Sequence, residues 1–411
     1  MLGNWKREIT EFTKSSQMKK NQKYKILHII TRWMAGGGAE RNTYFTIKGL
    51  DKSKYEVDLV IGGDSKAVPE NLEGVNIVKI NSLRRNIHPI DEFKALFQLY
   101  KLIKKRKYCL VHTHLAKAGM LGRFASKLAG VPVIVHTLHG SLFHDSLNPI
   151  VKFVYKNLER FSALYTTWLI SVGEDLKSRY LKAGVGKLEK YSVIRSGMDL
   201  EKFHKASKFS EEEIKEIRKS LNFSSDDIVI GMVASLEPRK GHKYAIEVAE
   251  EIIKRHPRVK FLFVGEGYLH SILEEIVRKK NLQNSIFFAG LRRDVEKVMA
   301  VFDILILTSL WEGLPQVLVQ GAVLGKPMVS FDVEGSNELI KEGKNGFIVP
   351  LKNTSEMIRK LDYLISSQKM AKMMGENGKE IVGQEWDIGS MTKKTSELYK
   401  YLLNENEKKQ K

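Results

Sequence analysis

The chain has 411 residues, 43% of them hydrophobic, which is enough apolar material for two or three packed domains and excludes a disordered or collagen-like protein. Its 68 Lys and Arg residues outnumber its 48 Asp and Glu residues, so the formal net charge of +20 raises the question of an anionic partner. The single cysteine, Cys109, excludes an internal disulfide and indicates a reducing compartment.

A basic N-terminal leader, 1–24, lacks the hydrophobic segment of a secretory signal, so we expect a cytoplasmic protein. Short apolar runs then alternate with amphipathic stretches of helical spacing. The runs predict strands at 24–30, 55–61, 109–113, 133–137 and 168–172, and the stretches predict helices at 39–50, 91–107, 116–129 and 149–164. This alternation is typical of a parallel sheet covered on both faces, which indicates an N-terminal Rossmann-like domain at 25–200.

A polar, turn-rich stretch at 196–210 interrupts this pattern, and a charged helix is predicted at 211–221. The alternation then starts again, with strands at 228–234, 259–264, 285–288, 304–308, 328–331 and 346–349 and helices at 244–255, 269–280, 295–300 and 315–324. We expect a second α/β domain at 201–385 and a C-terminal helix at 386–411 that packs back on the N-terminal domain. Because ligands of such sheets bind outside the carboxyl ends of the strands, two facing domains imply a site in the cleft between them.

The loop after the first strand holds three consecutive glycines, Gly36, Gly37 and Gly38, at the start of a helix. Their amides can approach a ligand closely, and a helix N-terminus favours an anion. The loop is not a dinucleotide fingerprint, because Arg41 stands where that pattern requires glycine. A plain tight turn is the alternative.

Histidines gather near the ends of two neighbouring strands of the first domain; they are His112, His114, His136, His139 and His144. A zinc site needs three or four converging ligands with supporting carboxylates, and Asp145 alone lies nearby in the sequence. We therefore predict no metal site. We expect the rings to line the rim of the sheet, where one or two of them serve a polar ligand.

Two cations follow the first strand of the second domain. Arg239 and Lys240 stand just before a helix, where ligands of that sheet bind, and two cations there suit a phosphate. A solvated pair that opens a surface helix is the alternative.

The most specific string follows the predicted strand 304–308. Glu312 stands in the loop, Pro315 suits the first turn of the next helix, and the amides of Gly313 and Leu314 lie at its positive end. Gln320 follows roughly one and a half turns further along. A carboxylate, a helix N-terminus and a second polar side chain form a site for a sugar and a phosphate.

From about Lys25 to its C-terminus, the chain resembles the family 4 glycosyltransferases, retaining enzymes of the GT-B fold with two facing Rossmann-like domains. Nine strings carry the resemblance in the family's order: Gly36–Arg41, His112–Leu121, His139-Gly140, Val193–Asp199, Gly231–His242, Val264–Gly267, Ser309–Leu324, Gly335–Ile340 and Asn345–Pro350. Their number and order make the resemblance specific.

The resemblance implies that a nucleotide sugar binds mainly to the second domain and an acceptor mainly to the first. Glu312 matches the first acid of the family's two-glutamate motif and should hold hydroxyls of the transferred sugar. Lys240 should neutralise the leaving diphosphate, and His139 should lie near the reacting sugar. Further donor contacts are expected at Gly37, Gly38, Arg239, Gly313, Leu314 and Gln320. The sequence has no Asp-x-Asp triplet, so we expect transfer without a metal or other cofactor, with the nucleotide sugar as substrate.

Two positions depart from the family pattern. The family's second glutamate falls at Gln320, which can still bond a ribose hydroxyl but lacks the charge that strengthens such a bond. The arginine that usually accompanies the lysine falls at Ser235, and we expect Arg239 or Arg195 to take its place.

The leading hypothesis is a retaining glycosyltransferase that moves a sugar from a nucleoside-diphosphate sugar, expected to be a UDP-sugar, to a glycan or lipid-linked acceptor in polysaccharide or cell-envelope glycan biosynthesis. Three alternatives stand beside it. They are a nucleotide-sugar epimerase of the same fold, a non-catalytic nucleotide-sugar-binding protein, and a nucleic-acid binder suggested by the charge alone.

The predicted helix Asp91–Lys107 suggests contact with a membrane. Its apolar residues near one face are Phe93, Leu96, Phe97, Tyr100 and Ile103, and its cations gather at Lys101 and Lys104–Lys107, after Arg84 and Arg85. A basic amphipathic helix can lie on an anionic leaflet, so we expect peripheral contact with the inner face of the cytoplasmic membrane. A normal sheet-packing helix with a solvated face is the alternative.

Overall fold

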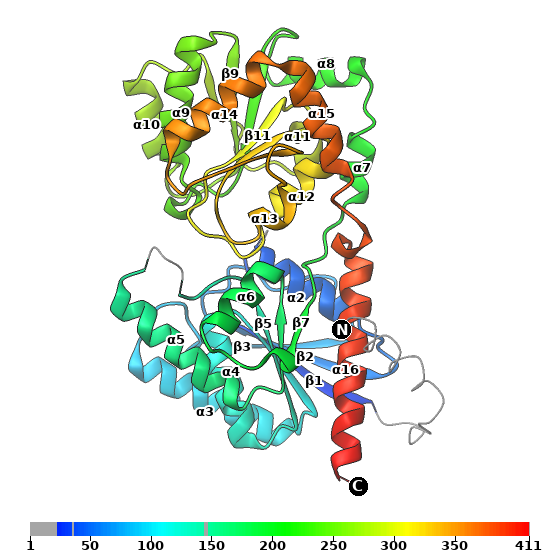
Figure 1. Ribbon diagram of the computed structural model, residues 1–411. Helices are drawn as coiled ribbons and strands as arrows, with labels where there is room; N and C mark the ends of the chain where they lie inside the picture. Colours follow the sequence, from blue (N-terminus) through cyan, green and yellow to red (C-terminus); the bar gives the residue numbers. More distant parts are fainter. Residues whose placement is uncertain (1–22, 35–36, 144–146, 411) are drawn as a thin grey trace.

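The computed structural model describes residues 23–34, 37–143 and 147–410, so Gly36, His144, Asp145 and nearly all of the leader lie outside the described residues. The chain forms two α/β units, one above the other in Figure 1, each built on a parallel sheet. In the first sheet the strand order is β3-β2-β1-β4-β5-β6-β7. These strands are β1 (Tyr24–Ile30), β2 (Tyr55–Gly62), β3 (Val75–Ile80), β4 (Leu110–His114), β5 (Val133–Leu138), β6 (Trp168–Ser171) and β7 (Tyr191–Val193).

Alternate residues of β1 face two different helical layers, as the period of two in a strand requires. Ile26 and Ile30 pack with α2 (Gly38–Lys48) and α16 (Ile388–Gln410). Leu27 and Ile29 pack on the other face with α3 (Pro89–Arg106) and α4 (Ala116–Ala129). The remaining helices of this unit are α5 (Pro149–Leu164), α6 (Glu174–Lys182) and the short 3-10 helix η2 (Leu188–Lys190).

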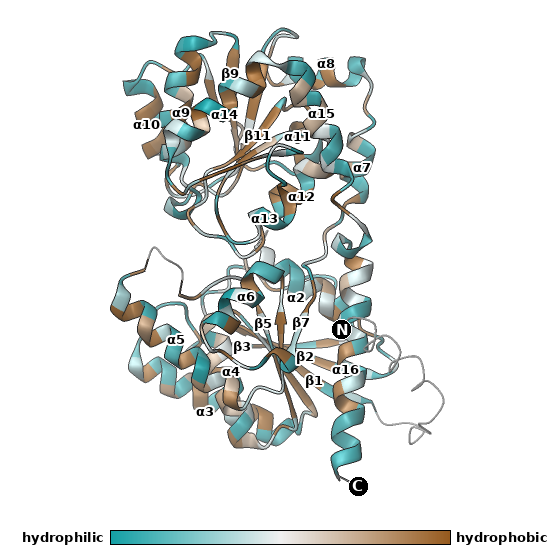
Figure 2. Cartoon of the chain, viewed as in Figure 1, coloured by the Kyte–Doolittle hydropathy of each residue, from teal (hydrophilic) through white to brown (hydrophobic). Residues whose placement is uncertain are grey.

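The second sheet has the strand order β10-β9-β8-β11-β12-β13. Its strands are β8 (Ile228–Val233), β9 (Val259–Val264), β10 (Ile286–Phe288), β11 (Ile304–Leu307), β12 (Met328–Phe331) and β13 (Gly346–Val349). Its helices are α7 (Glu201–Ala206), α8 (Glu211–Ser220), η3 (Pro238–Lys240), α9 (His242–Arg255), α10 (His270–Lys279), α11 (Val295–Ala300), α12 (Gln316–Val323), α13 (Ser336–Leu339), α14 (Thr354–Ser366) and α15 (Gln368–Lys379). Figure 2 shows hydrophobic residues along the strands of both units and hydrophilic residues over much of the outer helical surface.

Each sheet has one place where its strand order reverses. It lies between β1 and β4 in the first sheet and between β8 and β11 in the second. Loops that leave the carboxyl ends of such neighbouring strands diverge and leave room for a ligand. The fold therefore directs attention to the residues that follow these strands.

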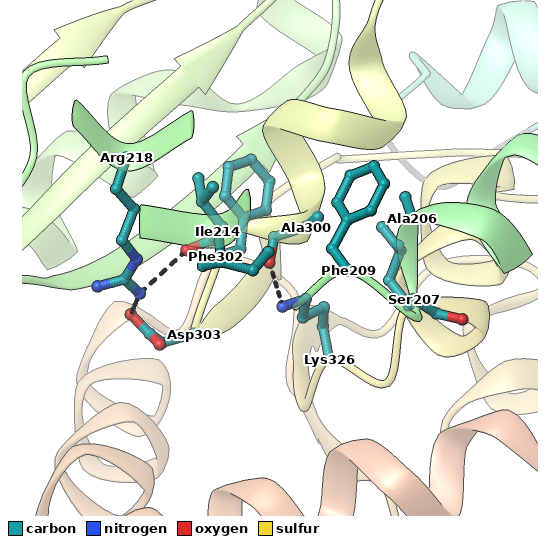
Figure 3. A pocket seen from close by; sticks show the side chains of 11 residues that line it. Ala206, Ser207, Phe209, Ile214, Arg218, Ala300, Phe302, Asp303 and Lys326 are labelled. Atoms are coloured by element: carbon teal, nitrogen blue, oxygen red, sulfur yellow. Dashed lines mark hydrogen bonds and ion pairs between the residues drawn. The ribbon is translucent and has the colours of Figure 1, made fainter. Parts of the chain in front are cut away.

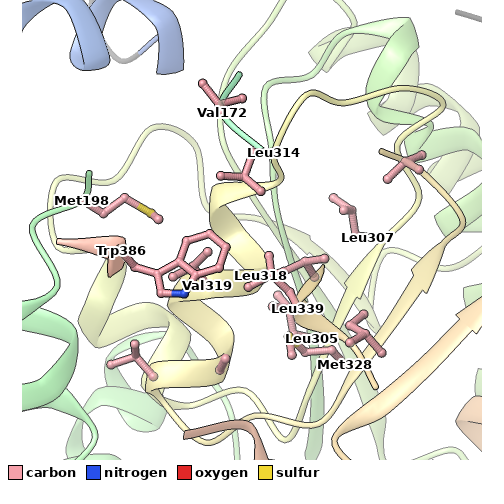
Figure 4. Close-up of a cluster of buried hydrophobic side chains, with 14 of the residues drawn as sticks. Val172, Met198, Leu305, Leu307, Leu314, Leu318, Val319, Met328, Leu339 and Trp386 are labelled. Atoms are coloured by element: carbon pink, nitrogen blue, oxygen red, sulfur yellow. The ribbon is translucent and has the colours of Figure 1, made fainter. Parts of the chain in front are cut away.

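One buried apolar cluster includes side chains from both units. Val172 and Met198 of the first unit lie beside Leu314 and Leu318 of the second, and Trp386 joins them (Figure 4). The two units therefore share an apolar core at their boundary.

After α15, the chain returns to the first unit through η4 (Gln384–Trp386). The amide of Met198 donates to the carbonyl oxygen of Trp386 at 3.0 Å. Helix α16 then runs along the first sheet (Figure 1), with Leu398 and Leu402 buried in the same cluster as Ile26 of β1. The C-terminal helix thus belongs to the packing of the first unit.

Several elements differ from those expected. The stretch 196–210, expected to be turn-rich, contains helix α7, which buries Phe203 and Ala206. Strands β3 and β7 and helix α6 had no predicted counterpart. Both of these strands lie at the edges of the first sheet, and their residues are only partly buried, so they lack a continuous apolar run.

Helix α3 divides the apolar residues that the sequence placed near one face. Ala95, Leu99 and Ile103 are buried, whereas Phe93 and Phe97 are exposed. Arg106 pairs with Asp58 and Glu56 at 3.0 Å, so it belongs to the fold rather than to a free basic cluster. No helix of the described ranges combines the length and apolar character that crossing a bilayer requires.

Candidate active site

The loops after β8 and β11 bring Lys240 and Glu312 together at the place where the second sheet reverses its strand order. The hydroxyl of Thr308, which follows β11, donates to the carbonyl oxygen of Lys240 at 3.1 Å. Gly241 has φ +69°, and a Cβ there would lie 2.0 Å from the carbonyl oxygen of Thr308. The two loops therefore approach each other so closely that only glycine fits between them.

Glu312 is held by two cations. The ammonium group of Lys240 forms an ion pair with its Oε1, and Nη1 of Arg239 lies 3.5 Å from its Oε2. Burial raises the pKa of Glu312, but the positive charges of Lys240 and Arg239 outweigh it and lower the pKa below the usual value. Glu312 is therefore ionised at neutral pH and can accept hydrogen bonds with both oxygens.

The second unit meets the first at Gly313. A Cβ on Gly313 would lie 1.9 Å from the carbonyl oxygen of His139, and one on Gly140 would lie 3.6 Å from the α-carbon of Gly313. The loop after β5 thus contacts the loop that carries Glu312. His139 and Gly140 belong to the first unit and Gly313 to the second, so this contact is made only when the two units pack together.

A second contact joins the glycine loop to helix α12. Gly37 is the N-cap residue of α2, and Gly38 opens the helix. A Cβ on Gly38 would lie 3.4 Å from Nε2 of Gln316, the first residue of α12. Gln316 was not predicted as a site residue; its place at a helix start, directly after Pro315, is the signal that could have indicated it.

The turn before α12 differs from the expectation in one respect. Pro315 is the N-cap residue of α12 and has an extended backbone, so it does not belong to the first helical turn. Gly313 and Leu314 therefore precede the helix by one residue more than expected, and the side chain of Leu314 is buried in the shared core. Gln320 lies within α12, four residues after Gln316.

Arg195 extends from the first unit to the second, but its partners there are not the residues around Lys240. Its guanidinium group pairs with Glu338 of α13 and stacks on the ring of Trp386, 4.3 Å from the ring centroid. Arg239 is therefore the better candidate to accompany Lys240. Ser235 lies in the same loop after β8.

Four histidines of the first unit are buried, and one of them bonds His139, which lies beside this site. His112 and His114 share the face of β4 that α16 covers, and His28 of β1 stands in register with His112. Nitrogen atoms of His28, His112 and His114 lie within 4.8 Å of one another. His136 points to the other face, where its Nδ1 lies 2.9 Å from the hydroxyl of Thr113.

His28 was not among the predicted histidines. It lies within the first strand, far from the others in the sequence, and only the pairing of β1 with β4 shows that it belongs to them. The convergence of three rings is closer than we expected when we predicted no metal site, and that prediction stays untested.

A cavity of about 210 Å³ lies elsewhere on the second unit (Figure 3). None of the predicted site residues lines it. Its two cations bind groups of the fold: Lys326 donates to the carbonyl oxygen of Ala300 at 2.6 Å, and Arg218 bonds Asp303 at 2.7 Å. Burial lowers the pKa of Lys326 to about 8.

Two family descriptions match most of the chain. "Glycosyltransferase Family 4" matches residues 36–202, and "Glycosyl transferases group 1" matches residues 213–381. The matched segments correspond to the two sheet-containing units.

Curated relatives match over nearly their whole length. The UDP-Gal:alpha-D-GlcNAc-diphosphoundecaprenol alpha-1,3-galactosyltransferase of Escherichia coli is 32% identical over 382 residues, which are 92% of this chain and 97% of that protein. The N,N'-diacetylbacillosaminyl-diphospho-undecaprenol alpha-1,3-N-acetylgalactosaminyltransferase of Campylobacter jejuni is 26% identical over 87% of this chain and 94% of its own length.

Solved structures show the same fold. The Anabaena protein Alr3699/HepE in complex with UDP superposes with a TM-score of 0.72 at 20% identity, over 92% of this chain and all of that chain. The sucrose-phosphate synthase of Thermosynechococcus elongatus reaches a TM-score of 0.77 at 18% identity, over 93% of this chain and all of that chain. These findings confirm the expected fold and the resemblance of the sequence: the chain belongs to glycosyltransferase family 4 and is a glycosyltransferase with the two-unit GT-B fold.

Proposed function

We propose that the protein transfers a hexosyl group from a UDP-sugar to a lipid-linked glycan acceptor, with retention of the anomeric configuration. The observation that carries this proposal is the largely buried ion pair of Glu312 and Lys240, next to Gly313, where the second unit meets the backbone of His139. Support for the substrates comes from the names of the relatives. The Escherichia coli protein uses UDP-Gal and a diphosphoundecaprenol acceptor, and the Campylobacter jejuni protein also acts on a diphospho-undecaprenol substrate.

On the donor side, each group has a defined role in this proposal. Lys240 and Arg239 bind the diphosphate, and Glu312 accepts hydrogen bonds from hydroxyls of the transferred sugar. Gln320 bonds the ribose, and the amides of Gly313 and Leu314 assist at the diphosphate. In the reaction, the bond between the anomeric carbon and the diphosphate oxygen breaks. The acceptor hydroxyl oxygen bonds to the same face of that carbon, and its proton passes to the leaving diphosphate.

When the donor binds, Lys240 and Glu312 each exchange the other for a group of the nucleotide sugar. Lys240 and Glu312 neutralise each other in the structure, with 14% and 9% of their side chains exposed. A diphosphate draws the ammonium group, while the sugar hydroxyls replace it at the carboxylate. Because both groups gain new partners, neither charge is left buried and unpaired.

We propose that this chemistry needs no metal. Cations and helix ends stabilise the charge that develops on the leaving diphosphate, which is the role a metal would otherwise fill. Gly38 offers its amide at the start of α2 on the opposite side, and the amide of Gly37, which donates to the carbonyl oxygen of Met34 at 3.4 Å, would exchange that long bond for the ligand. Burial lowers the pKa of His139 to about 3, so its ring is neutral near the reacting sugar.

Glu312 provides the direct test of this function. The purified protein is incubated with UDP-galactose and other UDP-sugars, together with an undecaprenyl-diphosphate-linked sugar, and the products are identified by mass spectrometry and NMR. Glu312→Ala and Glu312→Gln are expected to lower turnover by at least about 100-fold, because they remove a charged contact to the transition state. The product is expected to keep the α-configuration.

Glu237→Gln is the matched control, because the Glu237 carboxylate pairs with Arg239 at 3.4 Å, and its bond to Lys240 is made by the backbone carbonyl, which the substitution keeps. It is expected to retain turnover within about threefold. Full activity of Glu312→Gln would remove this role from Glu312. Conversion of the donor without an acceptor would indicate an epimerase, and donor binding without any turnover would indicate a binding protein.

We further propose that the first unit lies on an anionic membrane through helices α3, α4 and α5, which pack side by side in this order (Figure 1). Exposed apolar side chains cover this outer surface: Ile87, Ile90, Phe93, Phe97, Ile150, Phe153, Phe161 and Leu164. Helix α5 buries Glu159, Ser162 and Ala163, so its polarity is the reverse of an ordinary surface helix. Lys104 and Lys105 are exposed at the end of α3.

Vesicle binding tests the membrane proposal. The protein is expected to co-sediment with phosphatidylglycerol vesicles and to dissociate as salt is raised, because each cation near such a surface contributes about 1 kcal/mol. Lys104→Glu with Lys105→Glu should weaken binding by at least tenfold, whereas Lys215→Glu with Lys219→Glu on α8 of the other unit should not. Equal effects of the two double variants, or binding that salt does not change, would contradict this docking surface.

A further inference from the structure

A continuous series of hydrogen-bonded rings runs through the first unit, from the loop after β5 to helix α16. We call it the histidine chain: His139, His114, His28, Tyr399 and His112, in this order. Three histidines bond each other directly: Nε2 of His139 lies 3.1 Å from Nδ1 of His114, and Nε2 of His114 lies 3.1 Å from Nδ1 of His28. The Tyr399 hydroxyl continues the series, because it bonds Nε2 of His28 at 3.4 Å and also Nδ1 of His112. The series ends where Nε2 of His112 lies 2.7 Å from Oγ1 of Thr137.

The sheet holds the inner rings of the histidine chain in fixed places. His28 and His112 are direct neighbours across β1 and β4, and His114 follows two residues later on the same face. All three are buried, and so is Tyr399 of α16, whose hydroxyl lies within hydrogen-bond distance of both His28 and His112 while their rings remain 5.1 Å apart. No water is needed to connect the described rings.

The inner rings are neutral. Burial lowers the pKa of His28 to about 3, and burial together with the neighbouring rings holds those of His112 and His114 well below the ordinary value. A neutral imidazole has one N–H and one bare nitrogen, so each ring donates on one side and accepts on the other. Among the directly linked rings of His139, His114 and His28, all protons must therefore point the same way.

Two arrangements satisfy this rule, and they differ at His139. In one, Nε2 of His139 donates to His114 and its Nδ1 is bare. In the other, His114 donates to Nε2 of His139, whose proton then sits on Nδ1. Which nitrogen of His139 can donate is thus decided at the other end of these three rings, by whether the Tyr399 hydroxyl donates to Nε2 of His28 or accepts from it.

We propose that Tyr399 is a positioning residue for His139: its hydroxyl joins the two halves of the histidine chain and thereby fixes the tautomer and orientation of the His139 ring. The effect on catalysis rests on the proposed function, whereas the tautomer itself does not. Hydrogen-bond partners of metal-binding imidazoles fix the tautomer and ring orientation in this way in other proteins, and losing one typically costs about 10–100-fold in metal affinity or activity.

Removing the hydroxyl would break the series at one point. Nε2 of His28 and Nδ1 of His112 would each lose their partner inside the core. The rings of His28, His114 and His139 would then no longer be tied to a hydroxyl that fixes their direction, and both tautomers of His139 would become populated. The aromatic ring of residue 399 would still fill the same space.

Metal binding by the same rings is the competing explanation. Nitrogen atoms of His28, His112 and His114 lie within 4.8 Å of one another, but no carboxylate belongs to the group among the described residues. A divalent ion would also take lone pairs that the rings use for each other. We therefore assign the rings to a hydrogen-bonded series and make metal binding an outcome of the test.

The experiment compares Tyr399→Phe with Tyr55→Phe in the full chain labelled with ¹⁵N-histidine. Tyr55 is the matched control, because its buried hydroxyl bonds Ser396 of the same helix α16 but is not part of the histidine chain. Long-range ¹H–¹⁵N spectra report the tautomer of each ring, and steady-state kinetics with the UDP-sugar and lipid-linked acceptor separate kcat from KM.

Tyr399→Phe is expected to change the tautomer signals of the chain and to lower kcat about tenfold, with the donor KM within about twofold. Tyr55→Phe should change neither. If Tyr399→Phe does not fold, His28→Gln interrupts the same series and takes its place.

Unchanged tautomer signals in Tyr399→Phe, or equal kinetic losses in both variants, would overturn the proposal. So would tightly bound Zn²⁺ that removes the ring N–H signals from the wild-type protein. A wild-type protein without glycosyl transfer would instead refute the proposed function, and the spectra would still test the chain. Altered signals with unchanged kcat would leave Tyr399 a purely structural residue and reject its positioning role.

Discussion

The ion pair between Glu312 and Lys240 fixes both groups at the ends of β8 and β11. A lone buried carboxylate would take up a proton, but the neighbouring cations keep Glu312 charged. The lysine likewise avoids a costly solitary charge. The pair therefore keeps two reactive groups ionised and in place until substrate groups replace each partner.

Buried histidines make the stability of the protein depend on pH; they are His28, His112, His114 and His136. Burial lowers their pKa values in the folded state, whereas in the unfolded chain they return to about 6.5. Below pH 6.5 the unfolded chain therefore binds protons that the folded chain does not. The stability is complete above that pH and is lost as the pH falls toward the folded-state values.

We expect the free energy of unfolding to fall steeply between pH 6.5 and pH 5, by up to about 1.4 kcal/mol per pH unit for each such ring. Urea unfolding at a series of pH values measures this slope. His136→Asn should reduce this slope by the contribution of about one bound proton, while His204→Gln, at an exposed position, should leave the slope unchanged. A stability that does not vary from pH 7 to pH 5 would contradict the neutral, buried state of these rings.

Single residues differ in how far their place could be predicted. Glu312 and Lys240 each lie in the segment that connects an apolar strand to the next α-helix, so the general rule for parallel sheets assigns both to a ligand site. His28 and Tyr399 carry no such signal. Tyr399 stands 287 residues from His112, which it contacts, and only the return of α16 to the first sheet brings them together.

Whole elements could be predicted where the sequence repeats one simple pattern. The central strands β8 and β11 are buried on both faces and appear as continuous apolar runs, whereas the equally central β1 and β4 carry histidines among their apolar residues. Helix α7 escaped prediction because its six residues are too few to show a helical period. Short elements depend on tertiary packing for their existence, and the sequence pattern does not contain that information.

Helix α5 shows a different limit, because its existence was predicted correctly but its orientation was not evident. Glu159 faces inward and is fully buried, since Arg123 of α4 holds it with two bonds of 2.9 and 3.0 Å. Phe153 and Leu164 face outward, with 68% and 76% of their surface exposed. Hydrophobic periodicity alone would have assigned the apolar face to the core. The buried ion pair instead turns the face that carries Glu159 inward and leaves the apolar face exposed.

The boundary between the two units combines apolar and polar contacts. Beside the shared core, Glu338 of α13 accepts a hydrogen bond from the amide of Asp175 at 3.1 Å and pairs with Arg195. Arg179 pairs with Glu334 at 3.0 Å. Reacting groups contributed by both units must meet to within a fraction of an ångström, so contacts of this kind determine the geometry of the site.

Gly313 limits how closely the units can approach, and it provides a test at the scale of the whole molecule. In Gly313→Ala the new Cβ would lie 1.9 Å from the carbonyl oxygen of His139, so the loops must separate, whereas Gly140→Ala places its Cβ 3.6 Å from the nearest atom. A displacement of about 1 Å is expected to lower kcat/KM by roughly 100-fold in Gly313→Ala, while Gly140→Ala stays near wild type. Kinetics with small-angle X-ray scattering would measure both effects, and equal activity of the two variants would show that the units need not meet at Gly313 for transfer.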